Sequence, residues 1–304
     1  MSAPHGGASQ HIASGIGLRL ASAGFYSIMA ALLKLASTRG VVAPEMLFYR
    51  ALFGLPVVLA WVLSGPGLGA LATRRPWAHA GRSALGISSI LCTFQALIML
   101  PLADATTISF TAPAFATILS WLILREQVGR HRWLAILVGF AGVVIVMRPA
   151  ATGLALPAGG VAIGLLAALG TAGVVITLRQ LRHTEHVAAI VFWFFLASVG
   201  VGGCLLPFVG RVHETGTMFI LAAAGVAGGL MQLTLTASLQ KAPVSVLSPF
   251  DYLQIVGALA LGWLLLAEVP TTSTLAGAAL IVASGLYIAW RERLLQRRPA
   301  LPAG

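Results

Sequence analysis

Long hydrophobic stretches separated by short polar connections run through almost the whole chain. Ten of these stretches are long enough to cross a bilayer, since a spanning helix needs about 20 predominantly apolar residues. We place them at residues 15–37, 43–63, 81–100, 103–124, 132–148, 158–178, 187–208, 217–239, 243–266 and 273–291. The pattern predicts an all-α integral membrane protein with ten transmembrane helices.

Part of this pattern occurs twice, at a fixed offset of 142 residues. Aligned without a gap, residues 86–126 and 228–268 share ten identities in 41 positions. The segment WLILRE at 121–126 returns as WLLLAE at 263–268. Many secondary transporters are built from a duplicated hydrophobic unit, with the substrate path between the two copies. The repeat therefore favours transport.

The least apolar connection inside the chain, residues 149–157, separates the ten stretches into two sets of five. Because five is an odd number, the second set enters the membrane in the opposite sense, and the two sets form an inverted repeat around a central cavity. The expected organisation is a disordered cytoplasmic tail, a first five-helix repeat, a second inverted five-helix repeat and a basic cytoplasmic tail, at residues 1–14, 15–150, 151–292 and 293–304.

Composition and charge refine this picture. Hydrophobic residues make up 58% of the chain and charged residues 9%, against about 25% charged residues in soluble domains. The net charge of +11 could suggest a nucleic-acid partner. With a cytoplasmic N-terminus, however, fourteen basic residues fall at inner ends or loops and only four fall outside. This positive-inside bias predicts a bacterial inner membrane protein with both termini in the cytoplasm and no nucleic-acid partner.

Ionisable residues inside membrane segments are the first candidates for function, because burying a charge in a bilayer is costly. Arg50 lies about 10 Å into the second segment and Asp251 about 12 Å into the ninth, at a rise of about 1.5 Å per residue. Neither has a charged counterpart in the other copy, where Ile190 and Ser109 stand nearest. These two charges are therefore not part of the duplicated scaffold.

Each of the two charges has two open interpretations. Arg50 binds a substrate carboxylate or phosphate, which a guanidinium pairs through two hydrogen bonds, or it has a structural role in an internal salt bridge with Glu45 or in a contact at the helix end. Asp251 is a counter-ion for a substrate amine or a proton carrier, or it is locked to Arg50 or to backbone groups freed by Pro249. Glu45 itself is expected near the outer surface, in an interfacial position.

Polar and aromatic side chains on several helix faces complete the predicted site. For each one alone, helix–helix packing is an open alternative. Two prolines inside apolar segments each remove a helical hydrogen bond and are expected to break the helix at a gate. The predicted substrate-binding residues are Arg50, Asp251, Tyr252, Ser248, Gln95, Gln232, Tyr26 and Trp193, and the predicted gating prolines are Pro113 and Pro249.

Several other charged residues receive structural interpretations. Glu126 and Glu268 end the two copies of the repeat and are expected to orient the turn into the next helix. Lys34 and Arg179 are expected to extend to the membrane interface. All seven histidines fall in tails or loops, and the cluster at 183–186 is interpreted as a solvated loop rather than a metal site.

The chain contains none of the sequence signatures of nucleotide-driven or enzymatic chemistry that we sought. It has no G-x-x-x-x-G-K-[ST] segment, no zinc signature and no paired nucleophile and base. We therefore expect no cofactor, no metal site and no enzyme activity, with transport driven by gradients.

Five segments together resemble a known family. They are EMLFYR (45–50), TAPAFATILSWLILRE (111–126), WLAILVGFAGVVIVMRP (133–149), YLQIVGALALGWLLLAE (252–268) and LAGAALIVASGLYIAWR (275–291). They are similar to the ten-helix EamA-type branch of the drug/metabolite transporter superfamily, over residues 15–292. The resemblance implies a helical bundle around a central cavity, alternating access and small-metabolite cargo. Ile255 stands where the second copy should match Pro113, which departs from the family pattern.

The expected function is that of a secondary transporter that exports small metabolites, with amino acids as the expected cargo, across the inner membrane. The alternative is an importer of a vitamin or nucleoside-like cofactor, in which aromatic residues matter more than charges. A membrane enzyme or a helper subunit is a third possibility. The expected partners are a small-molecule substrate and the lipid bilayer. The sequence leaves the direction of transport, proton coupling and the oligomeric state open.

Overall fold

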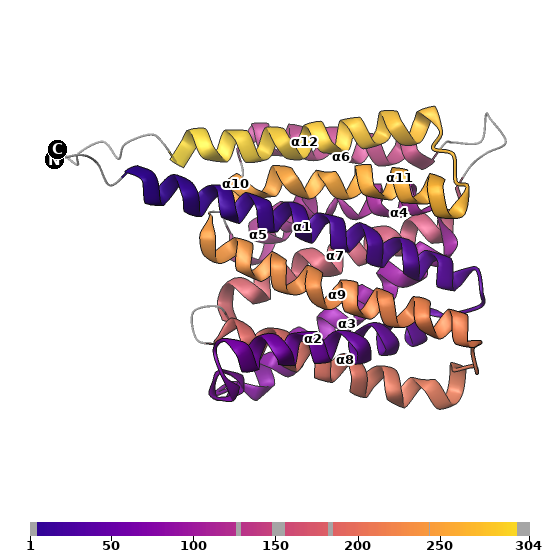
Figure 1. Ribbon diagram of the computed structural model, residues 1–304. Helices are drawn as coiled ribbons and strands as arrows, with labels where there is room; N and C mark the ends of the chain where they lie inside the picture. Colours follow the sequence, from indigo (N-terminus) through magenta and orange to yellow (C-terminus); the bar gives the residue numbers. More distant parts are fainter. Residues whose placement is uncertain (1–4, 126–128, 148–155, 182–184, 243, 297–304) are drawn as a thin grey trace.

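Helices account for all the regular structure in the described residues, which are 5–125, 129–147, 156–181, 185–242 and 244–296 of a computed structural model (Figure 1). The α-helices are α1 (His5–Ser37), α2 (Ala43–Ser64), α3 (Pro76–Met99), α4 (Leu102–Ser109), α5 (Ala112–Leu124), α6 (Arg130–Met147), α7 (Ala158–Leu181), α8 (Val187–Val209), α9 (Thr215–Lys241), α10 (Val244–Leu247), α11 (Leu253–Leu266) and α12 (Thr272–Gln296). Two 3₁₀ helices, η1 (Leu68–Leu71) and η2 (Ser248–Tyr252), join them.

The apolar helices of the described residues correspond to the ten predicted membrane segments. Eight spans are long and apolar enough to cross a bilayer. Two shorter apolar helices, Trp133–Met147 and Thr272–Ile288, complete the set. In this count α4 and α5 form one span, Leu102–Ile123. The predicted all-α membrane fold is confirmed.

The helices extend beyond the predicted segments at several ends. α1 begins at His5, within the stretch predicted as a tail, and α12 continues to Gln296. α3 begins at Pro76 rather than at residue 81, since proline suits the first turn of a helix. Hydropathy marks the part of a helix that lies in lipid, whereas the helix itself continues into water.

The two halves of the chain pack as an inverted pair. α1 lies along α9, and α7 lies along α3, which is the same pairing with the halves exchanged. α6 and α12 pack together at one edge of the bundle, and α2 and α8 at the opposite edge (Figure 1). The first and second copies therefore interlock, and their shared interface runs through the middle of the protein.

Glycines allow the closest of these helix contacts. At the crossing of α6 and α12, a Cβ atom on Gly277 would lie 2.6 Å from the carbonyl oxygen of Gly142. A Cβ atom on Gly142 would in turn lie 2.9 Å from the carbonyl oxygen of Gly277. Small residues at such crossings let helix backbones approach within membranes, where packing drives association.

The duplication is also visible in the backbone. Arg125 follows α5 with φ 54°, and Ala267 follows α11 with φ 53°. These two positions are 142 residues apart in the sequence, which is the offset of the repeat. Left-handed backbone is uncommon for residues other than glycine, and it commonly ends a helix. Both copies thus end the same span in the same way.

Each copy also contains one discontinuous span. α4 ends at Ser109 and α5 begins at Ala112, with Pro113 in the first turn of α5. In the second copy the interruption is η2, whose second residue is Pro249. Proline lacks the N–H that would continue the helical ladder. Discontinuous spans of this kind form the substrate sites of many secondary transporters.

Candidate functional site

A cavity of about 1030 Å³ lies between the two halves. The lining residues come from α1, α2, α3, α4, α5, α7, α9, η2, α11 and α12. At one end the cavity reaches Leu33 and Leu97, and at the other it reaches Ser120, Val175 and Ile288. Both discontinuous spans meet it, so the irregular backbone of each copy faces the same space.

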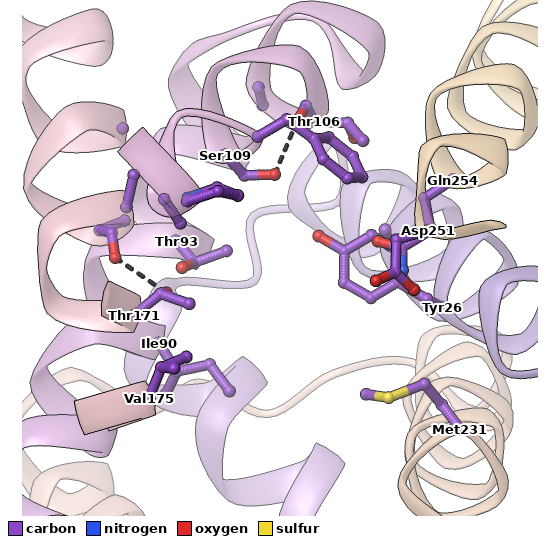
Figure 2. Close-up of a pocket in the computed structure, with 18 of the residues that line it drawn as sticks. Tyr26, Ile90, Thr93, Thr106, Ser109, Thr171, Val175, Met231, Asp251 and Gln254 are labelled. Carbon is purple, nitrogen blue, oxygen red and sulfur yellow. Dashed lines mark hydrogen bonds between the residues drawn. The ribbon is translucent and has the colours of Figure 1, made fainter. Parts of the chain in front are cut away.

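The two walls of the cavity differ in chemistry (Figure 2). Thr93, Ser109 and Thr171 line one wall with hydroxyl groups, and Tyr26 and Asp251 stand opposite them. The hydroxyls are anchored locally, since Ser109 Oγ donates to the carbonyl oxygen of Thr106 at 2.6 Å and Thr171 Oγ1 donates to that of Ala167 at 2.9 Å. Ser109 and Asp251 are counterparts in the repeat, so the duplication placed a hydroxyl and a carboxylate across one cavity.

Asp251 is paired with Arg19. The Arg19 Nε and Nη2 atoms each lie 2.6 Å from one oxygen of the Asp251 carboxylate. Such a two-bond geometry is the strongest form of an arginine–carboxylate contact. The side chains of Arg19 and Asp251 are 10% and 22% exposed. The interpretation of Asp251 as locked to Arg50 is wrong, because α1 brings Arg19 to η2 instead.

Arg50 lines the cavity without an acidic partner among the described residues. Its Nε lies 3.2 Å from Met29 Sδ, and its guanidinium carbon lies 5.4 Å from the centre of the Phe195 ring. Its Nη1 is buried and has no hydrogen-bond partner. The residue as a whole is 3% exposed.

Glu45 is not the partner of Arg50. Its carboxylate accepts from the backbone N–H groups of Val42 and Arg211, at 2.9 and 2.8 Å, and lies 2.8 Å from His213 Nε2. It is fully buried within the protein, in the first turn of α2. The correction has a simple cause: the segment before α9 folds over the first turn of α2 and covers the carboxylate.

The other predicted site residues divide into two groups. Tyr26, Gln232, Tyr252 and Pro113 line the cavity. Tyr252 also contacts Phe110, its repeat counterpart, with ring centres 5.0 Å apart.

Gln95, Trp193 and Pro249 do not line the cavity. Trp193 instead donates from Nε1 to the carbonyl oxygen of Leu71 at 2.9 Å. The side chain of Ser248 lies outside the described residues.

At the Leu33 end of the cavity, Lys34 and Glu268 connect α1, α3, α4 and the segment that follows α11. Lys34 Nζ donates to the carbonyl oxygens of Leu97 and Leu100 at 2.9 and 2.6 Å, and lies 3.8 Å from Glu268 Oε1. Glu268 Oε2 accepts from the N–H of Leu102 at 2.7 Å. Lys34 therefore does not extend to the interface, because the unpaired carbonyls at the end of α3 offer a nearer partner. Glu268 thus caps the start of α4, whereas the sequence predicted that it orients the turn into the next helix of the chain, α12. Its counterpart Glu126 lies outside the described residues.

Two charged residues inside predicted membrane segments were missed by reasoning from sequence. Arg19 is one of the fourteen basic residues that the charge pattern places at inner helix ends or loops, and it lines the cavity. Asp104 is 1% exposed and accepts from Thr274 Oγ1 at 2.6 Å, joining α4 to α12. The available signal was an ionisable residue within an apolar stretch, the same signal that identified Arg50.

The expectation that His79 lies in a loop is also wrong, as is the interpretation of Glu185 as part of a solvated loop. His79 is buried near the start of α3, and its Nε2 lies 3.3 Å from Glu185 Oε2. The backbone N–H of Arg74 donates to Glu185 Oε1 at 3.2 Å. Burial acts to raise the pKa of Glu185, but the hydrogen bonds from His79, Thr73 and Arg74 outweigh it and hold the pKa below its usual value. In the described residues, no three histidine, cysteine, aspartate or glutamate side chains form a potential metal site.

Comparison with known proteins identifies the family. The EamA-like transporter family model matches residues 13–148 and again 158–290. The chain is 31% identical over 274 residues to the pseudopaline exporter of Pseudomonas aeruginosa, covering 88% of this chain and 93% of the exporter. It is 29% identical over 253 residues to a riboflavin transporter of Rhizobium johnstonii, covering 83% of this chain and 81% of that protein.

A third named relative and one solved structure are also similar to this chain over most of its length. An S-adenosylmethionine uptake transporter of Rickettsia bellii is 28% identical over 252 residues, covering 82% of this chain and 84% of the transporter. One solved crystal structure shares the fold with a TM-score of 0.64 and 20% sequence identity, over 93% of this chain and 99% of that one. The chain therefore belongs to the EamA-like transporter family, and it is a multi-pass membrane transporter rather than an enzyme.

Proposed function

We propose that this protein is a secondary transporter that carries small metabolites, with amino acids as its cargo, outward across the bacterial inner membrane by alternating access. The observation that supports this most directly is the 1030 Å³ cavity between two inverted halves, with both discontinuous spans on its lining. Ligand pockets for small molecules fall in the range of about 300–1,000 Å³. A cavity of this size accommodates an amino acid with room for the water that accompanies a polar cargo.

The charge distribution supports an assignment of the two membrane sides. If the N-terminus of α1 is cytoplasmic, as the positive-inside bias favours, the Leu33 end of the cavity faces the periplasm. That end is tied by Lys34 and Glu268. The described conformation is then closed to the periplasm, and transport requires the Lys34 contacts to open while the opposite end closes.

The named relatives support a small-molecule cargo and carry different ones. One is named as an exporter of pseudopaline, one as a riboflavin transporter and one as an uptake transporter for S-adenosylmethionine. The amino-acid cargo proposed for this chain rests on the cavity and its charges, and the outward direction rests on the relative named as an exporter.

A second candidate cargo is a vitamin or a nucleoside-like cofactor moving inward. The aromatic contact between Phe110 and Tyr252, together with Tyr26 on the same lining, favours this candidate because flat aromatic ligands stack on such rings. It predicts that replacing Tyr252 by leucine abolishes transport while replacing Arg50 does not.

Counterflow into liposomes that contain only the purified protein tests the proposal. The liposomes are loaded with an unlabelled compound, and entry of the same labelled compound is measured for a panel of amino acids, riboflavin and nucleosides. Amino-acid entry supports the proposed cargo. Entry restricted to riboflavin or nucleosides supports the second candidate cargo instead of amino acids. Absence of entry across the panel contradicts both.

A further inference from the structure

The charged groups on the cavity lining define what the cargo must carry. Arg19, Arg50 and Asp251 are the three charged residues of the described lining. Arg19 and Asp251 neutralise each other through two hydrogen bonds of 2.6 Å. The cavity therefore presents one uncompensated positive charge, and that charge is on Arg50.

The surroundings of Arg50 leave it ready for an anion. The Met29 sulfur and the Phe195 ring hold the guanidinium by weak contacts, and neither carries a full negative charge. Nη1 is buried and unpartnered. Glu45, the nearest acid in the sequence, is occupied by His213 and two backbone groups. A buried cation without a counter-ion is costly, and an anionic cargo would remove that cost.

We infer that Arg50 binds a carboxylate of the cargo, so that the carboxylate is obligatory and an amine is dispensable. This inference rests on the proposed function and narrows its substrate class. A carboxylate brings one negative charge, which matches the single free guanidinium, whereas a phosphate monoester brings about 1.5 to 2. An amine on the cargo finds no free acid on the lining, because Arg19 already occupies Asp251.

Matched trios of compounds test this inference on purified protein. Alanine and phenylalanine are each used as the free amino acid, the N-acetyl derivative and the amide, and binding is measured as ligand-dependent thermal stabilisation. The free amino acid and the N-acetyl derivative should stabilise the wild type, and the amide should not. Arg50→Gln should weaken carboxylate binding by about tenfold to a hundredfold, since a hydrogen bond to a charged group contributes about 1.5–3 kcal/mol.

Arg82→Gln is the matched control. Arg82 is also a buried arginine over an aromatic ring, with its guanidinium carbon 4.1 Å from the centre of the Phe194 ring. It does not line the cavity, so its replacement should leave carboxylate binding unchanged. Arg50→Lys keeps the positive charge and should still bind the carboxylate compounds in preference to the amide. This variant tests the inference if Arg50→Gln does not fold.

The outcomes separate this inference from the proposed function. Equal stabilisation of the wild type by amide and carboxylate would overturn the inference, as would equal losses in Arg50→Gln and Arg82→Gln. Failure of all carboxylate compounds to bind the wild type also overturns it. Carboxylate binding with no counterflow would refute transport and leave the subsite intact. Counterflow of the amides would support transport and would overturn the carboxylate subsite.

Discussion

At the scale of single residues, the pairing of Arg19 with Asp251 determines which charges the cavity offers. The two side chains come from α1 and η2, more than 230 residues apart in sequence. An arginine and an aspartate inside apolar stretches were both visible in the sequence. Their pairing was not, since periodicity places a residue on a helix face but does not say which helix faces it.

A double-mutant cycle tests the strength of this pair. Asp251→Asn or Arg19→Gln alone leaves a largely buried charge without its partner, which should reduce the free energy of unfolding by about 2–3 kcal/mol. The double variant removes both charges and should be more stable than either single variant. Thermal melting of the purified variants measures this. Additive losses in the double variant would contradict the pairing.

A second residue-scale prediction concerns pH and Glu185. Because the pKa of Glu185 in the folded protein lies below its ordinary value of 4.5, the ionised carboxylate stabilises the fold above that value. This contribution should be lost as the pH falls through the lowered pKa. The melting temperature of Glu185→Gln should therefore lie below that of the wild type at pH 7, and the difference should shrink towards pH 3. A difference that is constant over this range would be inconsistent with the lowered pKa.

At the scale of elements, most of the helical architecture was predictable and its ends were not. Hydropathy located the ten spans because lipid demands apolar side chains and a fully paired backbone. It did not locate the start of α1 at His5, since a helix can continue beyond the lipid. The breaks near Pro113 and Pro249 follow from a missing N–H, whereas the role of Lys34 required knowing that α3 ends beside α1.

The crossing of α6 and α12 gives a prediction about packing. Gly277→Ala places a Cβ atom against the carbonyl oxygen of Gly142, and backbone cannot move aside easily. The variant should lose about 1–3 kcal/mol of stability. The control is Gly24→Ala, because a Cβ atom there meets no heavy atom within 4 Å. That variant should match the wild type or melt slightly higher, as alanine suits a helix better than glycine. Equal losses in both variants would contradict the close crossing.

The contacts of Lys34 give a prediction about opening at the Leu33 end. In a background without Cys92 and Cys204, a cysteine at Leu33 should react slowly with a membrane-impermeant maleimide, because Leu33 is fully buried. Lys34→Gln loses the charged hydrogen bonds to the end of α3 and should speed labelling about tenfold.

Lys241→Gln serves as the control for this experiment. Lys241 also ends a helix, but its Nζ contacts Ser14 at the exposed opposite end, at 3.0 Å. Its replacement should leave the labelling rate at position 33 unchanged. If Lys34→Gln labels no faster than Lys241→Gln, the Lys34 contacts do not hold that end closed.

At the scale of the whole molecule, the repeat in the sequence predicted two inverted halves and a path between them. The identities at a 142-residue offset carried that prediction, because duplicated units must pack against each other in an equivalent way. The residues that line this path were predicted less well. Tyr26, Gln232 and Tyr252 line it, whereas Gln95 and Trp193 do not, and the hydroxyl wall of Thr93 and Thr171 was not foreseen. Helix faces are easy to read from sequence, but their rotation towards a cavity depends on packing.

The most direct test of the account is whether cargo passes through this cavity. Ala168 lines the cavity on α7 and is 1% exposed, whereas Leu166, two residues away, is 57% exposed on the outer surface. Ala168→Trp should narrow the cavity, block the passage of cargo and abolish counterflow in liposomes, and Leu166→Trp should transport at close to the wild-type rate. Comparable counterflow by two folded variants would show that the cargo takes another route and would contradict the account.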